Sequence, residues 1–207
     1  MRGAGQLFGV VVVVASAWSG AGTAGAQVPL AVFPLRFHIP PHSTVDTSWL
    51  DLRLAVANES FAPYGVAFRA SPVRENGDPA ALDDMDAMDT LMEPRDLHRI
   101  DVFVVASIGL LDESDSECLG LTLSGRGTEQ HLPEFIAISA AAAEDVLAHE
   151  LGHFFGLGHV ADPHNIMYPS DRSTPPPWVL DASQGARIRL ALRQFSERGH
   201  PTPITDR

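Results

Sequence analysis

Three of the nine histidines in this chain lie within eleven residues, in the segment HELGHFFGLGH at positions 149–159. His149 and His153 are four positions apart, so on a helix they would project from one face, one turn from each other. Two imidazoles at this spacing can bind a single metal ion through nitrogen. Glu150 lies beside them, close enough to contact a water molecule on such an ion without binding the ion itself.

The glycine at position 156 explains how a third histidine could join the first two. A catalytic zinc ion needs three protein ligands and one open position, and a straight helix cannot supply the third ligand. Glycine can adopt the left-handed conformation that ends a helix and turns the chain. We therefore expect Gly156 to bring His159 back toward the helix. The alternative is a histidine-rich helix end that binds no metal.

The segment HELGHFFGLGH, followed by NIMYPSD at 165–171, resembles the metzincin zinc endopeptidases. In that family a methionine lies in a tight turn beneath the zinc site, and Met167 occupies the corresponding position. The string IMYP is most similar to the matrixin branch, whose turn commonly reads Met-Tyr-Pro. Two features depart from matrixins. Val160 stands where they have serine, and their Asp- and Gly-rich structural metal segment is missing before the histidines, so the branch is open.

The resemblance implies an α+β fold of the metzincin-like zincin type. Such a catalytic domain has a mixed, mostly parallel sheet with an antiparallel edge strand, an active-site helix and a C-terminal helix. Sequence patterns predict strands at 33–39, 65–71, 100–107, 119–125 and 134–139, and helices at 46–61, within 81–92 and around the histidines. The run IDVFVVAS at 100–107 is continuously apolar, as expected at the centre of a sheet. Asp181 and Gln184 have capping-box spacing ahead of an apolar stripe comprising Ile188, Ala191, Leu192 and Phe195.

The resemblance also implies a mechanism. His149, His153 and His159 would bind one catalytic Zn²⁺, and a zinc-activated water would hydrolyse the peptide bond. Glu150 would be the general base, and Met167 would support the site without binding zinc. Tyr168 would form part of the specificity-pocket wall or simply pack. The segment matching the substrate-binding edge strand comprises Leu119, Gly120, Leu121, Thr122 and Leu123.

The N-terminus has the composition of a targeting segment. Arg2 precedes the apolar run LFGVVVVVASAW at 7–18, and Ala24-Gly25-Ala26 fits a cleavage pattern. We expect a signal peptide at 1–26, a metzincin-like zinc metalloprotease catalytic domain at 27–207, and export to the periplasm or the extracellular medium. A retained membrane anchor is the alternative, although the apolar run is short for a bilayer span.

Composition limits the partners. The net charge is −12, from 26 acidic and 14 basic residues, which argues against nucleic acid or an anionic membrane surface. We expect a monomer that binds a peptide or protein substrate, with no membrane association after signal removal. The single cysteine, Cys118, cannot form an intramolecular disulfide. It is an incidental thiol or, as the less favoured alternative, a thiolate that blocks the zinc.

Some alternatives stay open at this point. Two acidic clusters could offer oxygen ligands to calcium, but neither has EF-hand spacing, so calcium has no support beyond composition. These clusters comprise Asp83, Asp84 and Asp86, and Asp112, Glu113, Asp115 and Glu117. The chain could also be a zinc hydrolase of a non-peptide amide, or a catalytically silent, zinc-stabilised binding module. The intact Glu150 argues against the binding module, because a scaffold needs only the histidines.

Overall fold

The computed structural model describes residues 31–74, 81–91, 98–109, 119–123, 135–169 and 174–198. The predicted signal peptide, Cys118 and the acidic cluster at 112–117 lie outside these residues. Within the described ranges, no helix is both long and apolar enough to cross a membrane.

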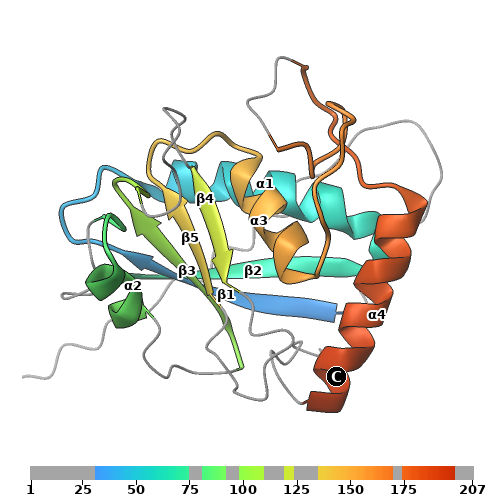
Figure 1. Ribbon diagram of the computed structural model, residues 1–207, viewed down its shortest axis with the longest axis horizontal. Coiled ribbons are helices and arrows are strands. Elements are labelled where there is room, and N and C mark those ends of the chain that lie inside the picture. The colour runs from blue at the N-terminus through green and yellow to red at the C-terminus, as the bar shows by residue number, and fades with distance from the viewer. Residues whose placement is uncertain are drawn as a thin grey trace, which may run out of the picture.

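In the part of the chain that the structure describes, five strands form one mixed sheet in the order β2-β1-β3-β5-β4 (Figure 1). They are β1 (Ala31–Ile39), β2 (Val66–Arg74), β3 (Ile100–Val105), β4 (Gly120–Leu123) and β5 (Phe135–Ser139). Strand β1 pairs in parallel with β2 and β3, and β3 pairs in parallel with β5. Strand β4 lies at the edge and is antiparallel to β5. The predicted fold class, with its antiparallel edge strand, is therefore confirmed.

The described residues also form four α-helices and one short 3-10 helix. They are α1 (Thr47–Phe61), η1 (Ala62–Tyr64), α2 (Met85–Leu91), α3 (Val146–Phe154) and α4 (Ala182–Arg198). Helices α1 and α3 lie side by side on one face, and α4 runs across one end of the sheet (Figure 1). Helix α2 packs on the other face, with Met88 and Leu91 against Phe103 and Val105 of β3.

Burial follows the strand periodicity. In β1 the residues Phe33, Leu35 and Phe37 alternate with the less buried Pro34 and Arg36 and face the larger core beneath α1, α3 and α4. Strand β3 is buried along its whole length, because even-numbered residues such as Val102 face this core and odd-numbered ones such as Phe103 face the smaller core beneath α2. The prediction of a central strand at this position is confirmed.

Several element boundaries differ from the prediction by one to three residues. Strand β1 begins at Ala31, two residues before its predicted start, and β3 ends at Val105, two residues before its predicted end. Strand β2 continues to Arg74, beyond the predicted end at residue 71, because its pairing with β1 runs to Ile39. Strand β4 spans only four residues, Gly120–Leu123, within the predicted 119–125. Helix α4 begins as expected. Asp181 Oδ1 accepts from the Gln184 amide at 2.9 Å, and Gln184 Oε1 accepts from the Asp181 amide at 2.8 Å.

Helix α1 buries a charged residue that its apolar periodicity did not predict. Leu50 and Ala57 are buried, and so is Arg53, which lies between them. Its guanidinium lies 3.7 Å from the centre of the Trp49 ring and donates to the main-chain oxygens of Trp49 and Ala142. These contacts of the two terminal nitrogens and the ring offset part of the cost of burying the cation, and they tie α1 to the segment that leads into α3.

Candidate metal centre

Helix α3 carries the first two histidines and ends at a defined turn. Its buried side includes Leu147, Leu151 and Phe154, which fix the helix on the sheet. Gly156 has φ 80°, in the left-handed region. The Gly156 amide donates to His153 O at 2.8 Å, and the Leu157 amide donates to Gly152 O at 2.9 Å. This pair of bonds is the Schellman motif, which ends the helix and reverses the chain.

The residue before the turn anchors it in the core. Phe155 packs edge-on against Phe33 of β1 and Phe195 of α4, with ring centroids 5.6 Å and 5.7 Å apart. The turn is therefore held from two elements, β1 and α4, and the direction in which the chain leaves Gly156 is fixed.

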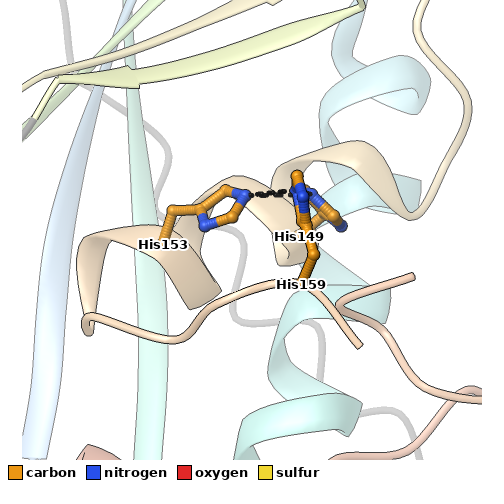
Figure 2. A group of neighbouring side chains, drawn as sticks. All are labelled: His149, His153 and His159. Carbon is orange, nitrogen blue, oxygen red and sulfur yellow. Dashed lines mark hydrogen bonds between the residues drawn. The ribbon is translucent and has the colours of Figure 1, made fainter. Parts of the chain in front are cut away.

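The turn brings the three histidines together (Figure 2). The Nε2 atom of His153 lies 3.1 Å from that of His149 and 3.0 Å from that of His159, and the remaining pair is 3.2 Å apart. His149 and His153 are half-buried on α3, whereas His159 is exposed on the segment after the turn. Within the part of the chain that the structure describes, these are the one group of His, Cys, Asp and Glu side chains placed to share a metal ion.

Two main-chain carbonyls orient the imidazoles. His149 Nδ1 lies 2.8 Å from Ile166 O, and His153 Nδ1 lies 3.0 Å from Leu157 O. A carbonyl oxygen can only accept, so each Nδ1 carries the hydrogen and each neutral ring presents its Nε2 lone pair to the centre of the cluster. Hydrogen bonds of this kind are typical of metal-binding histidines.

The donor set fits zinc. Nitrogen ligands about 2.0–2.1 Å from a tetrahedral zinc ion lie about 3.3 Å apart, close to the separations of the three Nε2 atoms. Burial lowers the pKa of His153 below its usual range, against the opposing effect of the hydrogen bond to Leu157, and the charge of His159 lowers it further. His153 is therefore held in the neutral form that binds metals.

Glu150 is on the same helix but is directed into the protein. Its side chain is 5% exposed, and it lies against β4, where it accepts a hydrogen bond from the Thr122 hydroxyl. Burial raises the pKa of the Glu150 carboxyl to about 7, and the hydrogen bond from Thr122 opposes this effect. A carboxyl group with such a pKa can both take up and release a proton near neutral pH.

Met167 lies directly beneath α3. Its side chain is fully buried, and a Cβ atom added to Gly152 would lie only 2.2 Å from Met167 Sδ. The methionine thus packs against the helix backbone between the two histidines of α3. The Met167 oxygen accepts from the Val160 amide at 3.0 Å, which ties this turn to the residue after His159.

The roles of the other predicted site residues stay predictions. Gly120, Leu121, Thr122 and Leu123 form β4, and Leu119 precedes it. Tyr168 is half-buried and follows Met167. The carboxylates of Asp83, Asp84 and Asp86 are exposed, and nothing in their arrangement tests calcium binding.

Sequence reasoning missed the contacts that support the site. It treated Thr122 as a substrate-binding residue and gave no role to Gly152 or to the carbonyls of Ile166 and Leu157. A small residue between the two histidines of α3 was a usable signal for Gly152. A carbonyl, by contrast, is present at every position, so the residue types gave no sign of the other two.

The fold and the three-histidine site together are of the zincin type. The profile of the matrixin family matches residues 72–184, which is more than half of the chain. The chain therefore belongs to the matrixin family, a family of zinc metallopeptidases. The predicted metzincin resemblance is confirmed.

Two solved structures are similar to this fold. Metalloproteinase-II from Bacteroides fragilis gives a TM-score of 0.59 at 12% sequence identity, over 81% of this chain and 55% of that one. This chain thus spans about half the length of the Bacteroides protein. Archaemetzincin from Methanopyrus kandleri gives a TM-score of 0.52 at 16% identity, over 78% of this chain and 96% of that one. No curated protein sequence shows a significant match.

Proposed function

We propose that this chain is an exported zinc-dependent endopeptidase, in which three histidines hold one Zn²⁺ and Glu150 is the general base. The observation that carries the proposal is the convergence of the Nε2 atoms of His149, His153 and His159 within 3.2 Å of one another. The carboxyl group of Glu150 lies on the same helix and is buried, as expected for a group that exchanges protons. A metal-binding scaffold would need the histidines but not this carboxyl group.

Different residues of the chain would have different roles in hydrolysis. A zinc ion at the three histidines would supply a Lewis acid that polarises the scissile carbonyl and lowers the pKa of a water molecule. Glu150 removes a proton from the attacking water as the oxygen bonds to the carbonyl carbon. It then delivers that proton to the amide nitrogen as the carbon–nitrogen bond breaks, so that the products are a free amine and a carboxylic acid, which loses its remaining proton to solvent at neutral pH. Met167 keeps α3 at its position without taking part in proton transfer.

Strand β4 is proposed to bind the substrate. It lies at the edge of the sheet and packs beside α3, which carries Glu150. An extended peptide can add to such an edge through main-chain hydrogen bonds from residues 119–123. We assign Tyr168 to the wall of the pocket that receives the residue after the cut, because it follows the buried Met167 and is itself only half-buried.

The test is cleavage of an unbiased peptide mixture by the zinc-loaded protein, beside Glu150→Ala. We expect cleavage by the unchanged protein, its loss in the variant, its loss after chelation, and equal zinc content in both proteins. Zinc binding without cleavage by either protein would contradict the endopeptidase proposal and favour a binding module. Activity on small amides but not on peptides would instead indicate a non-peptide hydrolase.

Export is proposed from the sequence of residues 1–26. The mature protein would begin at Gln27, after the Ala-Gly-Ala sequence. Intact-mass analysis of the protein recovered outside the cytoplasm of a producing cell tests this. A full-length chain in the membrane fraction would show a retained anchor instead.

A further inference from the structure

Strand β4 presents two small or polar residues to the active-site helix. Gly120 and Thr122 are two positions apart, so their side-chain positions lie on the same face of the strand. Both contact Glu150 of α3. The intervening Leu121 and the following Leu123 pack against the smaller core on the other side of the sheet. The face of β4 that is turned toward α3 is therefore shaped around one carboxyl group.

The Thr122 hydroxyl lies within hydrogen-bond distance of two oxygens of the same residue. Its Oγ1 is 2.6 Å from Glu150 Oε2 and 2.9 Å from the Glu150 main-chain oxygen. The hydroxyl has one hydrogen to donate. A hydrogen bond from a hydroxyl to an ionised carboxylate is short and strong, as the distance to Oε2 indicates. When Glu150 carries the proton, Oγ1 can accept from the carboxyl group and donate to the main-chain oxygen. One hydroxyl can thus hold Glu150 in both states of a proton-transfer cycle.

Gly120 supplies the space for the other carboxylate oxygen. A Cβ atom at this position would lie 2.4 Å from Glu150 Oε1 and 2.8 Å from Glu150 Cδ. Any side chain here would displace the carboxyl group. With Oε2 bound to Thr122 and Oε1 over Gly120, the carboxyl plane is held from two sides.

We propose that Thr122 is a positioning residue, whose hydroxyl aligns the Glu150 carboxyl group for proton transfer, and that Gly120 leaves room for this alignment. The inference depends on the proposed role of Glu150 as general base. It gives the side chain of Thr122 a role that is separate from any main-chain pairing of β4 with a substrate. A misplaced base slows proton transfer but leaves peptide binding intact, so kcat should change and KM should not.

The first experiment compares Thr122→Val with Thr122→Ser. Valine keeps the shape and the β-branching of threonine but lacks the hydroxyl, whereas serine keeps the hydroxyl. We expect kcat to fall about 10- to 100-fold in Thr122→Val, the loss that corresponds to one charge-assisted hydrogen bond, with KM within about twofold. Thr122→Ser should recover most of the lost rate, and all variants should bind zinc as the unchanged protein does.

The matched control is Thr90→Val. The hydroxyl of Thr90 also donates to a main-chain oxygen, that of Asp86 at 3.0 Å, but Thr90 lies on α2, on the other face of the sheet from α3. This variant makes the same substitution and also removes a threonine hydroxyl bonded to a main-chain oxygen, and it should keep its kcat. Gly120→Ala is a second, independent variant. It should lose kcat while retaining zinc, because the end of the Glu150 side chain can move away from the new methyl group.

The outcomes separate the inference from the function on which it rests. If the unchanged protein is no more active than Glu150→Ala, the proposed function fails. If Glu150 is required but Thr122→Val keeps its kcat within about twofold, the function stands and the positioning role of Thr122 is wrong. An equal loss in Thr122→Ser and Thr122→Val would also overturn it, because it would show that the shape of threonine matters and not its hydroxyl.

Discussion

The side-chain amides of Asn165 and Gln184 exchange two hydrogen bonds between the segment before Met167 and helix α4. Asn165 Nδ2 donates to Gln184 Oε1 at 2.8 Å, and Gln184 Nε2 donates to Asn165 Oδ1 at 3.1 Å. Asn165 Oδ1 also accepts from the Met167 amide at 2.9 Å. The next residue, Ile166, provides the carbonyl that orients His149. Helix α4 thus supports the metal centre through one pair of buried amides.

Replacing Gln184 by leucine should therefore destabilise the protein. The change removes both hydrogen bonds between Gln184 and the buried amide of Asn165, and it removes an acceptor from the Asp181 amide. We expect the free energy of unfolding to fall by about 1–3 kcal/mol, measured by urea denaturation. Gln194→Leu, at a half-buried glutamine of the same helix, is the control and should change it by no more than about 0.5 kcal/mol. Equal effects of the two substitutions would show that the amide pair has no special role.

Gly156→Ala should impair both stability and metal binding. A residue with a side chain in the left-handed region costs about 1–2 kcal/mol, and Gly156 has φ 80°. Relaxation of that strain would move His159 relative to α3, so the zinc affinity, measured by competition with a chelator, should also fall. Gly158→Ala is the matched control, because a Cβ atom there meets nothing within 4 Å and its φ is not positive. A Gly156→Ala protein as stable as the Gly158→Ala protein would refute the explanation of the turn.

The features that sequence predicted are those that a single element determines. Local geometry alone determines the four-residue spacing of His149 and His153, the turn at Gly156 and the Asp181–Gln184 cap. The structure contains the helix, the left-handed glycine and the capping hydrogen bond. The apolar run of β3 likewise reflects its own burial.

What sequence did not predict depends on contacts between distant segments. Thr122 and Glu150 are 28 positions apart, and nothing in the sequence around β4 shows which of its faces meets α3. The burial of Arg53 depends on Ala142, 89 positions away, which accepts from its guanidinium. The packing of whole elements determines these partners. Hydrophobic periodicity can therefore locate each element in the sequence without identifying the residues that it contacts.

The ionisation of Asp101 should make the free energy of unfolding depend on pH in acidic solution. It is buried in β3, where Oδ1 accepts from Arg36 Nε and from His38 Nε2, each at 2.7 Å. Burial alone would raise the pKa of Asp101, but the hydrogen bonds from His38 and Arg36 outweigh it and hold the pKa below the ordinary value of 3.8. A depressed pKa in the folded state means that the unfolded chain binds the proton more readily. The stabilisation is therefore fully present above pH 3.8 and is lost as the pH falls through the lower, folded value.

The measurement is the difference in unfolding free energy between the unchanged protein and Asp101→Asn, by urea denaturation from about pH 5 to about pH 3. We expect the unchanged protein to be more stable by about 1.5–3 kcal/mol at the highest pH of this range, the usual contribution of hydrogen bonds to a charged group. The difference in unfolding free energy should shrink as the pH is lowered. A difference that stays constant over this range would show that ionisation of Asp101 is not responsible.

Gly152→Ala sets two effects of opposite sign against each other. Gly152 lies within α3, and in an exposed helix alanine would be more favourable than glycine by about 1 kcal/mol. Here the new Cβ would lie 2.2 Å from Met167 Sδ and 3.5 Å from Leu157 Cδ1, and both of these side chains are buried. Overpacking of this kind costs about 1–3 kcal/mol, so we expect a net loss of stability on thermal or urea denaturation.

The contact with Met167 can be isolated by a second substitution. Met167→Leu shortens the side chain that meets the new methyl group, so it should cost less in the Gly152→Ala background than in the unchanged protein. Zinc affinity should follow the same pattern, because Met167 lies beneath the helix that carries His149 and His153. If Gly152→Ala instead raised the stability, helix propensity would have prevailed, and Met167 could not be packed against the backbone of α3. Additive effects of the two substitutions would likewise show that the two residues do not interact.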